Sequence, residues 1–180
     1  MKNIKSILAI LLCLAMVFAL AACGSEGDNN GGNGDNGGEA AQAVEYNVGE
    51  FSVKLPAGWN ALEVTSIDGG KDTNSIDIAK GTSLFSDPYI RIDYYGPSTT
   101  MMALSSSLYT NVEELDTMEI GGYTWNGFKC TAGSKPLINL QTEAGEHEFQ
   151  IAIWCEATNG TISLDDADVK AIIESITPNA

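Results

Sequence analysis

A tract with no core-forming side chain divides this chain into parts with very different folding capacities. Residues 24–39 consist only of Gly, Asn, Ser and acidic residues. Such a composition cannot bury enough apolar surface to fold, and about 20 residues of this kind span ~25 Å as a flexible coil. We therefore expect residues 23–43 to be a linker. Folding is then limited to residues 44–180, which are long enough for a single domain with one core.

The segment before the linker is organised like a secretory signal peptide. Lys2 and Lys5 precede an almost wholly apolar run from Ile7 to Phe18, and small residues follow. The run is close to the ~20 residues that a membrane-spanning helix needs. However, it ends in small residues and a polar tract, without the positive cluster of a stop-transfer segment. The order of charge, apolar run and small residues predicts a signal peptide over residues 1–22.

The sequence Leu20-Ala21-Ala22-Cys23 resembles the lipobox of bacterial lipoproteins. The resemblance implies cleavage before Cys23 and diacylglycerol on its thiol. The mature protein would then be lipid-anchored in the cell membrane, on its extracytoplasmic face. Two or more acyl chains give a stable anchor, since each buried CH₂ contributes ~0.8 kcal/mol. The alternative is an ordinary secretory signal cleaved near Ala22, with Cys23 incidental.

Acidic residues outnumber basic ones, which restricts the partners of the folded part. The whole chain has 9 Lys and Arg against 24 Asp and Glu, a net charge of −15, and residues 44–180 alone carry seven basic and twenty acidic residues. Nucleic-acid binding relies on clustered Lys and Arg, so nucleic acid is excluded as an expected partner. Direct docking of the folded part on anionic lipid is disfavoured for the same reason. This acidity suits a basic partner.

Strand patterns dominate residues 44–180. Apolar and polar residues alternate in Phe51–Leu55 and in Tyr89–Tyr95, which is typical of half-buried strands. Gly121-Gly122 and the turn around Ala144 and Gly145 each separate two apolar runs and predict hairpins. The run from Phe149 to Cys155 is apolar at both parities, which indicates a strand buried on both faces.

Two segments have the apolar period of helices. Ser98 is a natural N-cap, and the residues after it place an apolar stripe as far as Leu108. Asp165 to Ile176 predicts a second helix, with acidic residues at the positive end of its dipole. Hairpins combined with two helices predict an α+β fold, with an antiparallel sheet and helices packed on both of its faces.

The stretch from Phe51 to Trp59 resembles the opening signature of PsbP/Mog1-like domains, F-x-V-x-x-P-x-x-W. Ile120-Gly121-Gly122-Tyr123 and the closing Ile173-Glu174-Ser175-Ile176 add weaker matches. The resemblance implies an αβα sandwich around an antiparallel sheet. Members of this family serve as assembly or interaction subunits, and they share no catalytic constellation that these residues could inherit.

Few residues offer catalytic or metal chemistry. His147, the sole histidine, lies between two glutamates in the second hairpin turn, where a surface histidine is the ordinary expectation. Asp68, Asp72 and Asp77 lie near glycines but depart from the EF-hand pattern. Either a loosely built calcium site or a solvated loop fits them. We therefore predict no metal, no cofactor and no catalytic residues.

Two cysteines and two aromatic residues remain as candidates. Cys130 and Cys155 lie in expected strands, and either a disulfide or two buried thiols would fit them. A disulfide closing this loop of about 25 residues would stabilise the fold by ~3–4 kcal/mol. Trp125 and Tyr95 are candidate contacts for a ligand or partner, with core packing as the alternative.

The sequence thus favours a membrane-anchored binding or assembly module that is not an enzyme. Its partner would be an unidentified protein or small-molecule ligand. The alternative is an enzyme of the cell envelope, such as a hydrolase. That alternative requires a pocket in which catalytic residues converge, and the single histidine in a turn weakens it.

Overall fold

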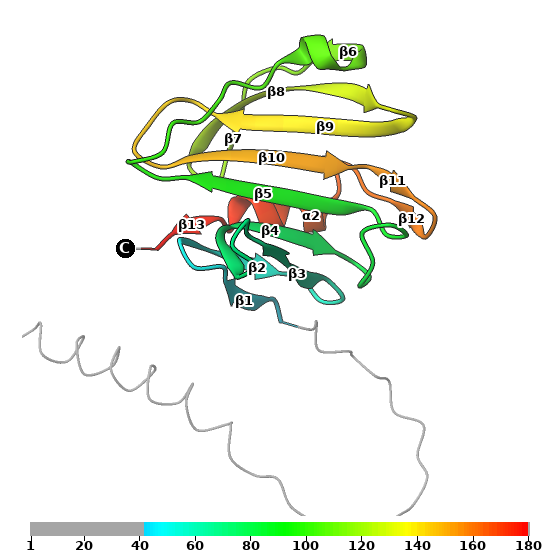
Figure 1. Cartoon of the computed structure of the whole chain (residues 1–180). Helices are drawn as coiled ribbons and strands as arrows, with labels where there is room; N and C mark the ends of the chain where they lie inside the picture. Colours follow the sequence, from blue (N-terminus) through cyan, green and yellow to red (C-terminus); the bar gives the residue numbers. More distant parts are fainter. Residues whose placement is uncertain (1–41, 180) are drawn as a thin grey trace, which may run out of the picture. The chain divides into compact units, whose positions relative to one another are not determined.

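The computed structural model describes residues 42–179 (Figure 1). The predicted signal peptide, Cys23 and all but the last two residues of the predicted linker lie outside this range. Among residues 42–179, no helix is both long and apolar enough to cross a membrane.

The main element is a large antiparallel sheet, in which the strands are ordered β3-β4-β5-β10-β9-β8-β6 and β7 also pairs with β8. Its strands are β3 (Asn60–Thr65), β4 (Lys71–Ala79), β5 (Tyr89–Tyr95), β6 (Thr110–Glu114), β7 (Met118–Ile120), β8 (Tyr123–Ala132), β9 (Lys135–Thr142) and β10 (Glu148–Trp154). Strands adjacent in sequence pair antiparallel in β3–β4, β4–β5, β7–β8, β8–β9 and β9–β10, whereas β5 pairs with β10 and β6 with β8.

Smaller elements complete the fold. A three-stranded sheet consists of β1 (Val44–Asn47), β2 (Phe51–Leu55) and β13 (Thr177–Pro178), and a short hairpin consists of β11 (Glu156–Ala157) and β12 (Gly160–Thr161). The helical elements are α2 (Ala167–Glu174) and the 3₁₀ turn η1 (Ser106–Leu108).

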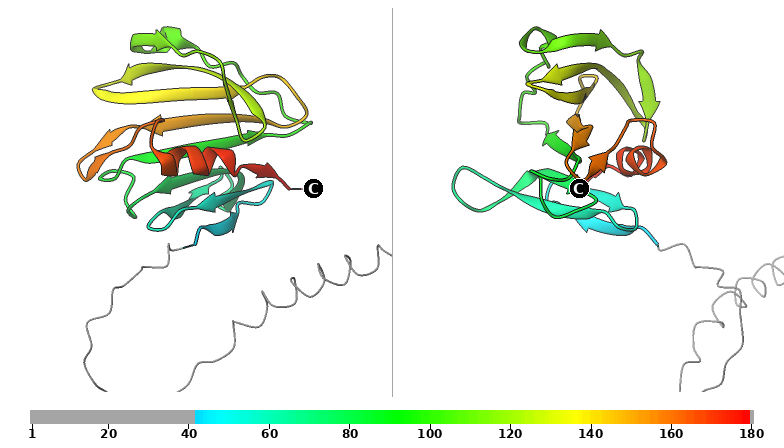
Figure 2. Two further views of the ribbon diagram at one scale, coloured as in Figure 1. Left: turned by 180° about the vertical axis from the view of Figure 1, so that it is seen from behind. Right: turned by 90° about the vertical axis from the view of Figure 1, so that its right-hand side faces the viewer.

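One face of the large sheet carries the core. The sheet curls so that α2 lies against its concave side, with the small sheet beside the helix (Figure 2). Buried residues of α2, β2 and the central strands form one cluster, whose largest members are Phe51, Phe149, Trp125 and the isoleucines at 76, 78, 90, 92, 151, 153, 172 and 173. The isoleucines of β4, β5 and β10 occupy alternate positions, as the period of a strand requires.

The predicted hairpins are confirmed, and glycines make their turns. Gly121 and Gly122 both have positive φ between β7 and β8, a conformation that side chains with a Cβ rarely adopt. The hairpin around Ala144 and Gly145 joins β9 to β10. The predicted strand at Tyr89–Tyr95 corresponds to β5.

The predicted helix after Ser98 is wrong. Residues 97–109, which we call the strap, run as irregular chain with only η1 near their end. Thr99 and Thr100 are β-branched, and the serines at 105–107 compete for backbone hydrogen bonds, so local helix propensity is low. The apolar stripe is not buried as a unit either, because Met102 and Leu108 are each 81% exposed.

The predicted α+β sandwich with helices on both faces is therefore also wrong. Within residues 42–179 the fold is mostly β, and α2 is its single α-helix. The second face of the large sheet is covered in part by the strap. There Leu104 and Tyr109 pack on a small cluster of Phe128, Cys130 and Leu137.

This arrangement explains the doubly apolar pattern of β10. Ile151 and Ile153 face the main core, whereas Ala152 and Trp154 pack against the small cluster under the strap. The pattern predicts burial on both faces, but it does not distinguish a helix from an irregular segment as the cover. One face of β10 is buried and the other is half-buried under the strap, so the expectation of burial on both faces holds in part, and the inference of a second helix layer is wrong.

Candidate functional site

A row of polar side chains crosses the second face of the large sheet. Strand register places five of them side by side on five adjacent strands: Ser75, Asp93, Gln150, Gln141 and Asn126. We call this set the polar row. Carboxylates accept hydrogen bonds, and side-chain amides both donate and accept them, so the row offers directional contacts to a polar ligand.

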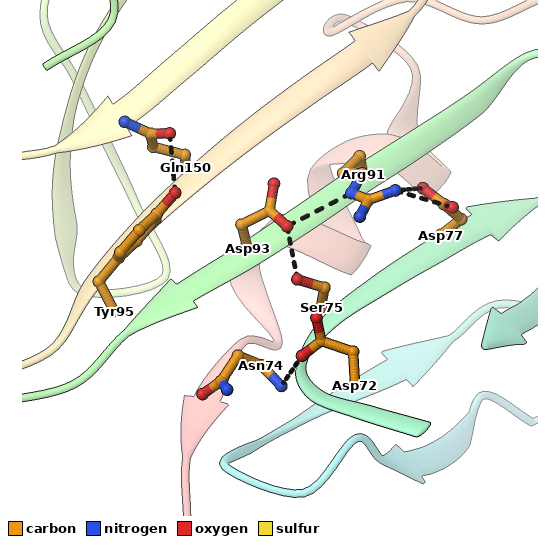
Figure 3. A network of polar contacts seen from close by, with 8 residues as sticks. All are labelled: Asp72, Asn74, Ser75, Asp77, Arg91, Asp93, Tyr95 and Gln150. Carbon is orange, nitrogen blue, oxygen red and sulfur yellow. Dashed lines mark hydrogen bonds and ion pairs between the residues drawn. The ribbon is translucent and has the colours of Figure 1, made fainter. Parts of the chain in front are cut away.

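One end of the polar row is tied into an ion-pair network (Figure 3). Arg91 lies 3.3 Å from Asp77 Oδ2 through Nη1 and 3.3 Å from Asp93 Oδ1 through Nε, and Ser75 Oγ donates to Asp93 Oδ1 at 2.6 Å. Burial raises the pKa of Asp77, and the charge of Arg91 opposes that shift. The carboxylates of Asp77 and Asp93 thus compensate the positive charge of Arg91.

The other end of the polar row holds the strap. Gln141 Oε1 accepts a hydrogen bond of 2.9 Å from the Leu104 backbone N–H, and Gln150 Nε2 donates one of 2.5 Å to the Met102 carbonyl. Because the strap has no regular secondary structure there, these side chains satisfy part of its backbone. Two glutamines therefore keep irregular chain in place above a sheet.

A hollow of about 500 Å³ opens between the strap and the β9–β10 hairpin. It continues into a smaller hollow of about 140 Å³, and the two share Asn126 and Gln141 in their walls. We call the two together the groove. The remaining lining residues are Gly96, Pro97, Thr99, Thr100, Met101, Ala103, Thr142, Glu143, Ala144, Gly145 and Glu148 in the larger part, and Leu104, Ser106, Glu114, Gly127 and Phe128 in the smaller part.

The charged residues that line the groove are all acidic: Glu143, Glu148 and Glu114. Glu148 Oε1 accepts a hydrogen bond of 3.0 Å from the Gly145 backbone N–H, which holds the carboxylate against the turn. Such a lining attracts positive charge and hydrogen-bond donors.

The two predicted aromatic contacts have different positions. Tyr95 lies beside the polar row, where its hydroxyl donates to Gln150 Oε1 at 3.3 Å, and burial raises its pKa. Trp125 is fully buried, and its Nε1 donates a hydrogen bond of 2.9 Å to the Ile120 carbonyl. Trp125 thus belongs to the core, as the packing alternative had it, and no ligand reaches it from the surface.

The two cysteines are free thiols in this structure. Cys130 belongs to the small cluster under the strap, whereas Cys155 packs against the main core on the other side of the sheet. Burial raises the pKa of Cys155 to about 11. Cys130 is buried and Cys155 is half-buried.

The remaining titratable candidates are engaged away from the groove. His147 Nδ1 shares a hydrogen bond of 2.7 Å with the Tyr94 hydroxyl. Asp68 bonds Ser66 and the Gly70 N–H within its own turn, and Asp72 accepts from the Asn74 N–H. Within residues 42–179, no three His, Cys, Asp or Glu side chains are grouped to hold a metal ion.

Sequence reasoning found Tyr95 but missed Gln141, Gln150 and Asn126. Each of these occupies a position in its own strand that points to the second face, so strand parity alone would have placed each of them on that face. Their meeting in one row depends on the pairing of β5 with β10 and on its register. Neither follows from local pattern.

The comparisons with known proteins leave the family open. No family model matches the chain, and no curated protein matches it. A crystal structure from Bacteroides thetaiotaomicron VPI-5482 at 1.50 Å resolution is similar over 79% of this chain and 50% of its own length, with 11% identity and a TM-score of 0.44. The chain thus spans about half the length of that protein, and a likeness this distant carries no argument about function.

Proposed function

We propose that this protein is a lipoprotein of the extracytoplasmic membrane face whose β domain is a non-catalytic binding module with the groove as its ligand site. The observation that carries the proposal is the groove itself, about 500 Å³ in its larger part and bordered by the polar row. Ligand sites are typically concave, with a few polar groups that fix the orientation of the ligand.

The membrane anchor is supported by sequence. An apolar run ending at Phe18 leads to Leu20-Ala21-Ala22-Cys23, and a polar, glycine-rich linker follows. A tether of this length and composition leaves the domain free to rotate above the membrane. Because the domain carries a net negative charge, an acyl anchor is the route to a membrane that its surface would not provide.

The non-catalytic role is supported by where the reactive side chains lie. General acid–base or nucleophilic catalysis needs its groups within hydrogen-bond reach of a bound substrate. His147 is bonded to Tyr94, and the thiols of Cys130 and Cys155 are packed in apolar clusters. The groove is lined by neither imidazole nor thiol, and its acidic residues Glu143, Glu148 and Glu114 are the groups that the turnover outcome below tests.

The binding role is tested by blocking the groove. Ala144 is exposed at the groove wall, so Ala144→Trp fills the hollow without touching the core. Ala57→Trp, at an exposed turn outside the groove, is the matched control. We expect the full chain and Ala57→Trp to retain the same compounds from a cell-envelope extract, and Ala144→Trp to lose them.

Two results would overturn the binding role. Equal retention by all three proteins would place the ligand elsewhere. Turnover of a retained compound by the full chain, abolished in Ala144→Trp, would favour the enzyme alternative.

The anchor is tested by labelling cells with a palmitate analogue. Label should enter the wild-type chain and Cys13→Ala, because the first cysteine leaves with the signal peptide, and it should not enter Cys23→Ala. Label in Cys23→Ala, or an unmodified Cys23 in the mature wild-type protein by mass spectrometry, would refute the anchor.

A further inference from the structure

We infer that the groove takes a small molecule that combines a protonated amine with hydroxyl oxygens, the chemistry of an amino sugar. The inference rests on the proposed function and narrows its ligand to one chemical class. Three observations carry it: the sign of the charge that lines the groove, the ion pairing of Arg91 on the same face of the sheet, and the hydrogen-bonding groups that the groove amides leave available.

The first feature is the charge of the lining. Glu143 and Glu148 border the larger part and Glu114 the smaller, and no Lys, Arg or His lines either part within the described chain. A concave wall with charges of one sign focuses the field and concentrates ligands of the opposite sign. An anionic ligand would meet only like charges there.

The second feature is the ion pairing of Arg91, which lies on the same face of the sheet. Arg91, in β5, does not line the groove, and it lies 3.3 Å from both Asp77 and Asp93. Its charge is already compensated, so it offers little to a carboxylate or phosphate. Arg91 therefore adds little positive charge to the groove wall.

The third feature is what the amides of the groove floor still offer. Asn126 Oδ1 accepts a hydrogen bond of 2.7 Å from Thr117 Oγ1, and Gln141 Oε1 accepts the one from Leu104. With both amide oxygens engaged, the NH₂ groups are the ends left to a ligand, and they need acceptor oxygens. Hydroxyl oxygens would meet that requirement beside an amine held by the glutamates.

These requirements act together on one molecule. An ammonium group donates to the carboxylates of Glu143 and Glu148, and the neighbouring hydroxyls accept from Asn126 and Gln141. A simple polyamine satisfies the first requirement and lacks the second. A neutral sugar satisfies the second and lacks the charge, and a sugar acid adds repulsion.

The experiment compares four probes on one scaffold: D-glucosamine, D-glucose, N-acetyl-D-glucosamine and D-glucuronate. Each is titrated at pH 6, where the free amine of glucosamine is protonated, into the ¹⁵N-labelled full chain in detergent micelles. The side-chain amide signals of Asn126 and Gln141 report binding. We expect glucosamine to shift them with an affinity at least about threefold above glucose and N-acetylglucosamine, since exposed charges contribute modestly, and glucuronate to leave them unmoved.

Variants test whether the glutamates supply the preference. Glu143→Gln and Glu148→Gln should each weaken glucosamine binding by about threefold and leave glucose binding unchanged. Glu45→Gln, an exposed glutamate of β1 outside the groove, changes net charge equally and should have no effect. Dispersed amide spectra show that each variant is folded.

The outcomes separate this inference from the proposed function. Equal or tighter binding of glucose or glucuronate at the groove would refute the amino-sugar class while leaving a binding module. Spermidine, titrated in the same way, is the control for an amine without hydroxyls, and equal shifts by it would refute the hydroxyl part of the inference. If none of the probes moves the amide signals while Ala144→Trp still loses envelope compounds, the class is wrong and the proposed function stands.

Discussion

Trp59 donates a hydrogen bond from its Nε1 to Asp168 Oδ2 at 3.0 Å, although 109 residues separate the two. Trp59 ends the Phe51–Trp59 stretch, and Asp168 is in the first turn of α2. Lys80 lies over the indole ring and 3.6 Å from the same carboxylate. Trp59 thus fastens the single α-helix of the described chain to the sheets.

Removing this hydrogen bond should weaken the fold without abolishing it. Trp59→Phe keeps an aromatic ring and loses the donor, and we expect the free energy of unfolding to fall by about 1–2 kcal/mol. Urea denaturation measures it. Combining Trp59→Phe with Asp168→Asn should give a coupling energy of about 0.5–1 kcal/mol, and purely additive effects would show that the contact does not contribute.

Arg91 compensates the charge of a buried carboxylate, so the stability lost when Arg91 is replaced should depend on pH. Arg91→Met leaves Asp77, which is 4% exposed, without its cation, and we expect a loss of about 3 kcal/mol at pH 7. Burial already raises the pKa of Asp77, so the folded state binds its proton more tightly than the unfolded chain does. The contribution of Asp77 to stability therefore falls as pH rises through its titration, and more steeply without Arg91.

The corresponding measurement is urea unfolding of both proteins from pH 7 down to pH 3. The difference between wild type and Arg91→Met should shrink in acid, where Asp77 is protonated. A constant difference would mean that Arg91 acts through packing alone.

Cys155 should react slowly with thiol reagents in the folded protein. Its pKa is raised to about 11 by burial from a usual value of 9.0. At pH 8 this lowers the thiolate fraction about 100-fold, and the thiolate is the reactive form. Iodoacetamide labelling followed by peptide mapping measures the rate, with the urea-unfolded chain as reference. Equal rates in the folded and unfolded chain would contradict the burial of this thiol.

Gly127 marks a close approach of β8 to β9. A Cβ at this position would lie 2.0 Å from the Asn139 carbonyl oxygen. We expect Gly127→Ala to cost about 3 kcal/mol or to prevent folding, because backbone would have to shift. Gly145→Ala is the control: its Cβ meets nothing closer than 4.0 Å, and thermal unfolding should show a small change.

The glutamines of the polar row should govern opening of the strap. Gln141→Leu removes the acceptor of the Leu104 N–H, and a lost hydrogen bond of about 1 kcal/mol corresponds to roughly fivefold faster exchange. Hydrogen exchange by NMR measures this at Leu104. The Thr99 N–H, bonded to the Gly96 carbonyl, serves as the internal reference. Equal acceleration at both amides would indicate general destabilisation.

Sequence patterns located most strands and both glycine hairpin turns, because alternation and turn chemistry are local properties. They also located α2, whose buried Val169, Ile172 and Ile173 have helical spacing. The helix predicted after Ser98 is absent because the strap, although its apolar residues have helical spacing, is rich in Ser and Thr, which have low helix propensity. Without a surface to bury that stripe, spacing alone did not make a helix.

For the candidate site, too, local pattern indicated some residues, and tertiary packing decided the position of others. Tyr95 was found because it alternates with buried residues in a recognisable strand. For Trp125 the sequence left a ligand contact and core packing open, and the curl of the sheet over α2 buries it completely. Burial at a strand end depends on what packs there from elsewhere in the chain.

By itself the sequence predicted a linker before the domain, determined that residues 44–180 are strongly acidic and rich in hairpin signals, and showed that the N-terminal segment resembles a lipoprotein signal. These properties depend on composition and on neighbours along the chain. Tertiary structure decided that the second face of the sheet is covered by irregular chain, that the polar row assembles from five strands, and that a groove remains beside it. Those features arise from the long-range pairing of β10 with β5 and from its register, which no local period encodes.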